Sequence, residues 1–262
     1  MCKALGIFDS GLGGISVLQA VHTLMPTEPL IYVADSAHAP YGGKTEAHIV
    51  ARSLAVSRFL LEQGAKAIVL ACNTATVHAV EQLRAELPVP VIAIEPAVKP
   101  AVQLTQSGVI GVLATERTAH SVRLQRLIAQ YSAGKQVLVQ ACPGLVEHVE
   151  EGDFDSPALQ YLLQRYVQPL LDQGADTLVL GCTHYPFLSN VLRELAGDSV
   201  TILETSWAVA QQVQRVLMQK ALLCQESCLG SVRFFSNKHT GAHLQSMQCL
   251  WGKALLVERF EA

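Results

Sequence analysis

The chain has 262 residues, half of them hydrophobic, and 19 Lys and Arg residues against 22 Asp and Glu residues give it a formal net charge of -3 at pH 7. This length can bury a large core, either as one large domain or as two small ones. The sequence has no basic run for binding along a nucleic-acid backbone and no apolar run long enough for a membrane helix, and Asp9 interrupts the first apolar stretch before it reaches the length of a signal-peptide core. We therefore expect a cytoplasmic protein that binds neither nucleic acid nor membrane.

Short apolar runs alternate with longer amphipathic segments along most of the chain. Strands are predicted at 4–9, 30–35, 67–72, 91–96, 109–115, 136–141, 177–182 and 200–205. Helices are predicted at 13–24, 45–64, 74–87, 97–107, 117–131 and 207–223, together with one that ends near Gln173. Because strand and helix alternate, the expected architecture is parallel sheets covered by helices.

An internal repeat relates the two halves of the chain. LLEQGAKAIVLACNT (60–74) aligns without a gap on LLDQGADTLVLGCTH (170–184), at an offset of 110 residues. Helix end, glycine, strand and terminal cysteine coincide, so Cys72 and Cys182 occupy equivalent positions. Open α/β sheets bind ligands at the carboxyl ends of their strands, and both cysteines stand there. The repeat predicts two similar α/β halves with a site in the cleft between them.

The carboxy-terminal stretch is less regular, with strand candidates in SVRFF and ALLVERF. Its pairs Cys224 with Cys228 and His239 with His243 loosely resemble a zinc-finger arrangement. The ten residues between the pairs are fewer than usual and include a strand candidate, so we expect packed or solvent-facing side chains instead. The chain's seven cysteines lack the dense spacing of a disulfide framework, which predicts free thiols in a reducing compartment.

Two polar turns follow the first two predicted strands. Asp9 precedes SGLGG, whose backbone N–H groups ahead of a helix suit a carboxylate or phosphate ligand, although a simple tight turn fits equally. Asp35 precedes APYGG, which is either a plain loop or a cluster of backbone donors over a ligand. The sequence leaves both pairs of alternatives open.

Two facing thiols could form a redox disulfide, share a metal ion, or act as base and acid on opposite faces of a carbon atom. Redox pairs are usually closely spaced, and metal binding would need further ligands, for which no recognised spacing exists here. Acid–base chemistry fits better, since a carboxylate or imidazole beside a thiol can take its proton. A pyridoxal cofactor would need a Schiff-base lysine, and the ordinary interpretation of Lys44, Lys66 and Lys99 is surface charge.

Five motifs in order, FDSGLGG, ADSAHAPYGGKT, ACNTAT, EPAVKPA and LGCTHYP, closely resemble those of bacterial glutamate racemases. These enzymes interconvert L- and D-glutamate without a cofactor, and the resemblance spans nearly the whole chain. It implies two flavodoxin-like domains, residues 1–97 plus 206–262 and residues 98–205, with the active site in the cleft between them. It also implies no metal ion, a homodimer, supply of D-glutamate for peptidoglycan precursors, and a cell-wall precursor as a candidate activator.

The same resemblance assigns roles to individual residues. Cys72 is implied as the base toward D-glutamate and Cys182 as the base toward L-glutamate. Asp9 would assist Cys72, while His184 and Glu150 would assist Cys182. The residues implied to line the glutamate site are Asp9, Ser10, Pro40, Tyr41, Gly42, Cys72, Asn73, Thr74, Thr115, Thr118, Cys182, Thr183 and His184.

Some alternatives stay open at this point. The segment ACPGLVEHVEEG departs from the family pattern at Gly144 and His148, and Glu151 is an adjacent rival for the position of Glu150. The substrate could be aspartate or another acidic amino acid, and the chain could also be an amino-acid-binding or regulatory protein on a racemase scaffold. The presence of both Cys72 and Cys182 favours the enzyme.

Overall fold

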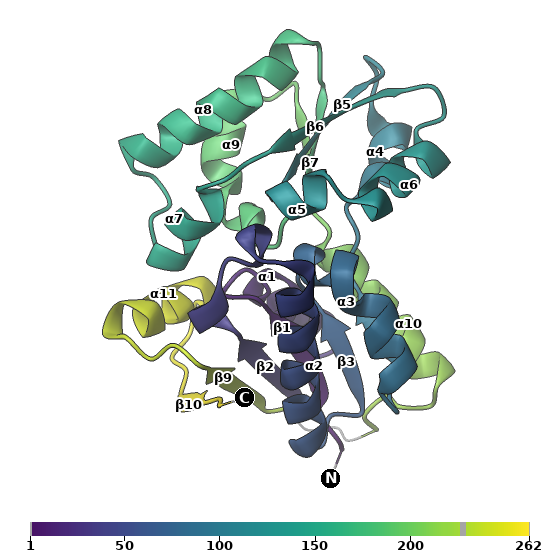
Figure 1. Ribbon diagram of the computed structural model, residues 1–262, viewed down its shortest axis with the longest axis vertical. Helices are drawn as coiled ribbons and strands as arrows, with labels where there is room; N and C mark the ends of the chain where they lie inside the picture. The colour runs from purple at the N-terminus through teal and green to yellow at the C-terminus, as the bar shows by residue number, and fades with distance from the viewer. Residues whose placement is uncertain (1, 226–228, 262) are drawn as a thin grey trace.

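The computed structural model describes residues 2–225 and 229–261, and in it strands and helices alternate as predicted (Figure 1). The strands are β1 Leu5–Asp9, β2 Leu30–Ala34, β3 Ala67–Leu70, β4 Val91–Ala93, β5 Val109–Ala114, β6 Gln136–Ala141, β7 Thr177–Leu180, β8 Thr201–Leu203, β9 Val232–Ser236 and β10 Val257–Arg259. The α-helices are α1 Ile15–Leu24, α2 Glu46–Glu62, α3 Asn73–Glu86, α4 Val98–Leu104, α5 Glu116–Ala119, α6 Val122–Tyr131, α7 Leu145–Glu151, α8 Pro157–Asp172, α9 Ser189–Ala196, α10 Ser206–Gln219 and α11 Gly241–Trp251. Short 3₁₀ helices are η1 Ser36–His38, η2 Tyr41–Gly43 and η3 Tyr185–Leu188.

The described strands form two parallel sheets, which confirms the predicted fold class. The first sheet has the order β10-β9-β2-β1-β3-β4 and the second has the order β6-β5-β7-β8. In Figure 1 the first sheet lies in the lower part of the molecule and the second in the upper part, each with helices on both sides. Strand β9 returns to the first sheet beside β2, and β10 pairs with β9 at the sheet edge, while the residue bounds of the two domains stay a prediction.

The duplication inferred from the sequence is visible in the topology. The order β2-β1-β3-β4 of the first sheet matches β6-β5-β7-β8 of the second, and β3 and β7 are offset by the 110 residues of the repeat. The preceding helices α2 and α8 end at matching positions. Gly64 and Gly174 then adopt φ angles of +83° and +87°, a left-handed conformation that glycine adopts without steric cost after a helix. The repeat in the sequence therefore corresponds to a repeat in the structure, in which the end of a helix, a glycine turn and a buried strand follow one another in both halves.

Buried apolar strands and the contacts between the halves make up the core. Every residue of β1, β3 and β7 is buried, as expected for strands covered by helices on both faces. One continuous apolar cluster includes Leu12 and Ile15 from the first half and Leu145, Val149 and Tyr185 from the second. The two halves are thus packed against each other at the carboxyl ends of their strands, where the predicted site residues lie.

The structure differs from the predicted helices in several places. The helix expected over 117–131 is divided into α5 and α6, because Ser121 accepts a hydrogen bond from the Leu124 amide and caps the second helix. The helix expected over 207–223 ends at Gln219, and Ala221 has a positive φ of 54°. The helices α9 and α11 were not predicted, and the buried face of α11 includes the polar residues His243 and Ser246.

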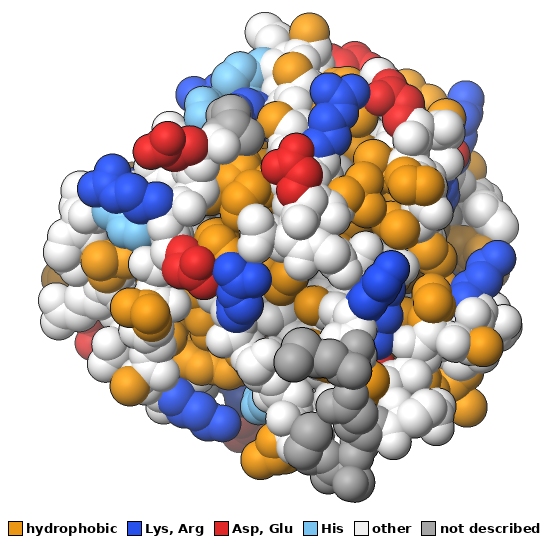
Figure 2. Space-filling view, turned by 90° about the horizontal axis from the view of Figure 1, so that it is seen from below, with side chains coloured by type: hydrophobic (Ala, Val, Ile, Leu, Met, Phe, Trp, Pro, Cys, Tyr) orange, Lys and Arg blue, Asp and Glu red, His pale blue; other side chains and the backbone are white. Residues whose placement is uncertain are grey.

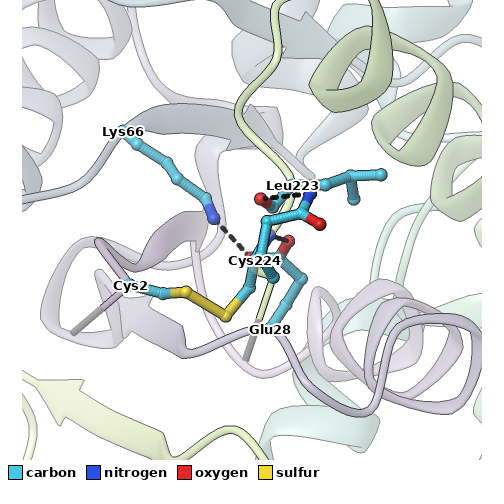
Figure 3. Close-up of a disulfide and its surroundings, with 6 residues drawn as sticks. Cys2, Glu28, Lys66, Leu223 and Cys224 are labelled. Atoms are coloured by element: carbon cyan, nitrogen blue, oxygen red, sulfur yellow. Dashed lines mark hydrogen bonds and ion pairs between the residues drawn. A yellow bond between two sulfur atoms is a disulfide. The ribbon is translucent and has the colours of Figure 1, made fainter. Parts of the chain in front are cut away.

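The prediction of free thiols is wrong for Cys2 and Cys224, which form a disulfide (Figure 3). Cys2 precedes β1 and Cys224 lies in the segment that leads to β9, and β2 lies between these two strands in the sheet. Burial also contradicts the interpretation of Lys66 as surface charge, since its side chain is 5% exposed and pairs with Glu28. Glu28 accepts a second hydrogen bond from the Cys224 amide at 2.6 Å. The same edge of the sheet therefore brings together an ion pair and a disulfide that the spacing along the chain did not reveal.

The Cys/His pairs of the carboxy-terminal stretch do not assemble as a metal site in the residues that are described. Cys224 is taken up by the disulfide, and Cys228 lies outside the described residues. His239 and His243 both form hydrogen bonds with Ser236. Within residues 2–225 and 229–261, no group of His, Cys, Asp and Glu is arranged to hold a metal ion.

The surface carries mixed charges on the face viewed in Figure 2. Lys and Arg side chains are scattered singly among Asp and Glu side chains there, with hydrophobic side chains exposed between them. None of the helices in the described part of the chain has the length and apolar composition needed to cross a membrane.

Candidate active site

The two repeat-related cysteines follow the central strands β3 and β7. Cys72 is 5% exposed and Cys182 is 6% exposed, so both thiols are shielded from bulk water. Burial raises the pKa of the Cys72 thiol well above its usual range, and the negative charges of Asp9 and Cys182 raise it further. Both cysteines therefore lie buried at the seam, by which we mean the interface between the two halves of the molecule.

Cys72 stands at the start of helix α3 and serves as its N-cap. The Ala75 amide donates to the Cys72 Sγ atom at 3.4 Å, and the Cys72 thiol lies 3.5 Å from the Ser10 hydroxyl oxygen. Both hydrogen bonds lower the thiol pKa, in opposition to burial. A helix N-terminus favours negative charge, so this position can stabilise a thiolate while it exists during a reaction.

Cys182 has a different set of partners, formed by His184 and Glu150. The Nδ1 atom of His184 lies 3.7 Å from the Cys182 sulfur, and the Nε2 atom of His184 lies 2.7 Å from the Oε1 atom of Glu150. A carboxylate can only accept, so Nε2 carries the proton in this contact. Burial lowers the pKa of His184, but hydrogen bonds and charge interactions with Cys182 and Glu150 outweigh it and raise the pKa well above its usual value. The geometry therefore favours an imidazolium between a carboxylate and a sulfur atom.

Burial distinguishes Glu150 from its neighbour Glu151. Glu150 is 8% exposed and also accepts from the Leu12 amide at 2.5 Å, whereas Glu151 is exposed to solvent. Only Glu150 lies beside His184. Between the two candidates, the geometry favours Glu150.

The SGLGG turn of the first half holds these side chains of the second half. A Cβ atom at Gly11 would lie 1.9 Å from the Glu150 Oε1 atom, and a Cβ atom at Gly13 would lie 2.3 Å from the His184 Nδ1 atom. Glycine is needed at both positions because the backbone approaches the two side chains so closely. The turn is therefore more than a connection between β1 and α1, since it forms one wall of the site.

Asp9 joins the two halves at the end of β1. The Thr183 hydroxyl donates to Asp9 Oδ1 at 3.3 Å, and the Gly11 amide donates to Asp9 Oδ2 at 3.2 Å. The hydroxyl of Tyr32 donates to the Gly11 carbonyl at 2.7 Å and so supports the same turn. Sequence reasoning missed Tyr32, because a tyrosine inside an apolar strand gives no signal beyond core packing.

Three threonines form another connection across the seam. The hydroxyl of Thr74, at the start of α3, lies 2.9 Å from that of Thr115 and 3.4 Å from that of Thr118. Asn73 is 4% exposed, and neither its side-chain nitrogen nor its oxygen has a partner among the described residues. A buried amide without partners is costly, so these atoms are available to a polar ligand.

The APYGG turn reaches the seam through two of its residues. Pro40 and Gly42 line a pocket of about 110 Å³ together with Thr115, Cys142 and other residues of the second half. The hydroxyl of Tyr41 donates to buried Asp35 at 2.5 Å, while the place of Tyr41 in the lining of the glutamate site stays a prediction. The structure thus gathers the predicted residues at one seam, and the Tyr41 hydroxyl is engaged elsewhere.

Comparison with known proteins places this arrangement in a family. A model of the Asp/Glu/Hydantoin racemase family matches residues 15–213. The chain is 50% identical over 247 residues to a glutamate racemase of Methylococcus capsulatus, an alignment that covers 94% of this chain and 91% of the relative. The chain belongs to the Asp/Glu/Hydantoin racemase family. The predicted resemblance to glutamate racemases is confirmed.

Solved structures of racemases from this family share the fold. A glutamate racemase from Bacillus anthracis superposes with a TM-score of 0.90 at 28% identity, over 99% of this chain and 97% of that one. The Escherichia coli glutamate racemase, solved with L-glutamate and the activator UDP-MurNAc-Ala, gives a TM-score of 0.87 at 28% identity, over 99% and 98% of the two chains. The family's two-domain fold is therefore the fold of this chain.

Proposed function

We propose that this protein interconverts L- and D-glutamate, with Cys72 and Cys182 as the two groups that exchange the α-proton. One observation supports the assignment of these roles to Cys72 and Cys182. Two buried cysteines end equivalent strands of a duplicated fold, and each has its own set of proton-accepting or proton-donating neighbours. A reaction that inverts one carbon centre needs a base on one face and an acid on the other.

The proposed reaction of L-glutamate begins at Cys182. The Cys182 thiolate, held beside the His184 imidazolium, takes the α-proton, and the Cys72 thiol then gives its proton to the opposite face of the carbon. The product is D-glutamate, with Cys182 now a thiol and Cys72 a thiolate. In the reverse direction Cys72 is the base and Cys182 the acid. The enzyme returns to its starting state by proton exchange through Asp9, His184 and water.

The intermediate is a carbanion next to a carboxylate, and its charge must be stabilised by hydrogen-bond donors. Within the described residues, the unpartnered amide of Asn73 is the best placed donor, because it adjoins Cys72 and loses no existing bond on binding a ligand. The backbone N–H groups of the SGLGG turn and the hydroxyls of Ser10, Thr74 and Thr183 complete the proposed donor set. The burial of both thiols favours this arrangement, since exclusion of water strengthens each electrostatic contact.

The remaining assignments follow from the resemblance. The proposed role is the supply of D-glutamate for peptidoglycan precursors in the cytoplasm, without a cofactor or metal ion. Because the Escherichia coli structure contains L-glutamate and UDP-MurNAc-Ala, we extend the substrate and the class of activator, a cell-wall precursor, to this protein. A homodimer and two domains formed by residues 1–97 plus 206–262 and by residues 98–205 are part of the same proposal.

The decisive experiment is incubation with L-glutamate in heavy water, followed by optical rotation and by the deuterium content of the α-position. The proposal predicts that rotation decays toward zero and that deuterium enters the D-product. The variants Cys72→Ser and Cys182→Ser should fold but should not racemise. Exchange with L-aspartate and not with glutamate would instead assign the site to an aspartate racemase. Binding of glutamate without any exchange would favour the regulatory alternative.

A further inference from the structure

We infer that Arg52 and Asn237 are positioning residues, which act through Asp35 to hold residues 36–43 against the second half of the molecule. The inference rests on the proposed function, because Pro40, Tyr41 and Gly42, which belong to residues 36–43, are the members of this segment assigned to the glutamate site. None of these three side chains touches the paired cysteines in the described contacts. They form a separate polar cluster on the first half.

Asp35 is the centre of the cluster. It is fully buried and accepts hydrogen bonds from Arg52 Nε at 3.0 Å and Arg52 Nη2 at 2.8 Å. It also accepts from the Tyr41 hydroxyl at 2.5 Å and from the side-chain nitrogen of Asn237 at 2.5 Å, and it lies 3.1 Å from the Nδ1 atom of His38. A carboxylate offers about four acceptor positions, so Asp35 is saturated by donors. Buried carboxylates with this many donors fix the groups around them.

Asn237 joins the carboxy-terminal part of the chain to this loop. The strand β9 pairs with β2 in a register that sets Ser236 opposite Ala34, so the next residue of each strand, Asn237 and Asp35, also meet. While the Asn237 amide nitrogen donates to Asp35, its oxygen accepts from the Ala37 amide at 2.8 Å. The Asn237 side chain therefore binds Asp35, which precedes η1, and Ala37, which lies within η1. Strands β9 and β10, which have no equivalent in the second sheet, supply this contact.

The held loop reaches the seam at Gly42. A Cβ atom placed on Gly42 would lie 3.1 Å from the Thr115 Cβ atom, so the Gly42 backbone lies close against the Thr115 side chain. Thr115 in turn hydrogen-bonds to Thr74, two residues after Cys72. The cluster around Asp35 thus controls how closely the loop meets the second half, and we expect it to affect substrate binding more than the proton transfers.

Asn237→Ala is the sharpest test, because it removes the hydrogen bonds to Asp35 and Ala37, together with the 3.3 Å contact to His38, without leaving a buried charge unpaired. We expect the KM for glutamate to rise about tenfold, the effect of losing a hydrogen bond to a charged group, with kcat changed by less than about threefold. Asn237→Gln, which keeps the amide group, should recover most of the loss. Asn237→Asp, which matches asparagine in shape but cannot donate to Asp35, should be at least as impaired as the alanine variant. Asn190→Ala, at an exposed position on α9, is the matched control.

A second variant tests the geometry of the arginine. Arg52→Lys keeps the positive charge but loses the paired donors, so KM should rise while the ion pair with Asp35 persists. Arg58→Lys, on the same helix in an exposed pair with Glu86, should leave KM unchanged. Equal KM values for Arg52→Lys and wild type would contradict a role for the fork geometry.

Hydrogen exchange separates this inference from the proposed function. In Asn237→Ala, backbone amides of residues 36–43 should exchange faster while the amides of β1 and β3 keep their protection. This measurement needs no substrate, so it holds even if the wild type does not racemise glutamate. Unchanged exchange in residues 36–43, or an equal loss of protection in β1 and β3, would overturn the inference. The second result would mean that Asn237 supports only the general stability of the fold.

Discussion

Replacing Glu150 by glutamine tests whether a carboxylate charge controls the acid–base state of Cys182 and His184. The glutamine oxygen can still accept from Nε2 of His184, so the substitution removes charge and keeps shape. A hydrogen bond to a charged group contributes about 1.5–3 kcal/mol. Since the Glu150 contact is 2.7 Å long and buried, we expect a loss in this range, which corresponds to roughly a 10- to 100-fold fall in kcat/KM.

The assay measures initial rates from each enantiomer across a range of pH. Enantiomers have equal free energy, so kcat/KM must fall by the same factor in both directions, and the effect on kcat shows which direction depends more on His184. Glu150 is one cause of the raised pKa of His184. Without its charge that pKa must fall, so the alkaline limb of the pH profile, where His184 loses its proton, should move to lower pH.

The matched control is Glu151→Gln, which changes the adjacent, exposed carboxylate and should leave the rate and the profile as in the wild type. Equal behaviour of the two variants would refute the assignment of Glu150. An alkaline limb that stays in place while the rate falls would refute the electrostatic reasoning, because it would mean that Glu150 only shapes the site.

Three further outcomes can be measured separately. In Gly13→Ala the new Cβ would lie 2.3 Å from Nδ1 of His184, so kcat should fall at least about tenfold, while Gly241→Ala, at an open position, should be active. Cys2→Ser should lower the free energy of unfolding by about 5 kcal/mol in urea titrations under oxidising conditions, and should match the wild type in reductant, because the disulfide closes a chain segment of 222 residues. Hydrogen bonds from Thr105, Gln106 and Ser107 outweigh burial and lower the pKa of Asp176. The ionised Asp176 carboxylate therefore stabilises the fold at pH values above its unfolded-state pKa, and this stabilisation is lost as the pH falls through its folded-state pKa. Asp176→Asn should therefore lower the free energy of unfolding by about 2 kcal/mol at neutral pH and by progressively less in acid. An equal loss of unfolding free energy at all pH values would contradict the role of the Asp176 charge.

The sequence predicted the parts of the fold that are local or repeated. Strand β3 and helix α2 were recognisable because each has a regular apolar pattern, and the 110-residue repeat carried the same assignment to β7 and α8. The positions of both cysteines followed from the same pattern. The roles of the residues around them, such as Asp9 and His184, came from the resemblance, because periodicity says nothing about which side chains meet across a cleft.

Contacts between distant segments were the part that sequence reasoning missed. The disulfide, the buried pair of Lys66 with Glu28 and the cluster around Asp35 all join segments far apart in the chain. Each contact depends on strand order, since β9 must lie beside β2 before Asn237 can reach Asp35. In a parallel sheet the order of the strands in space can differ from their order along the chain. The side-chain partners at the ends of the strands can therefore be predicted only after the spatial order is known.

The duplicated fold also explains why the two thiols are equivalent in position and different in chemistry. The repeat places each cysteine at the end of a central strand, which directs the two sulfur atoms toward the seam from opposite halves. Beyond that point the halves diverge: Cys72 caps helix α3 near Asp9, whereas Cys182 leads into η3 with His184 as its partner. A reaction between enantiomers requires opposite faces, which the repeat supplies. It does not require identical proton partners, because equal efficiency in both directions is imposed by the equal free energies of substrate and product. The two strand ends can therefore carry different neighbours around cysteines that occupy equivalent positions.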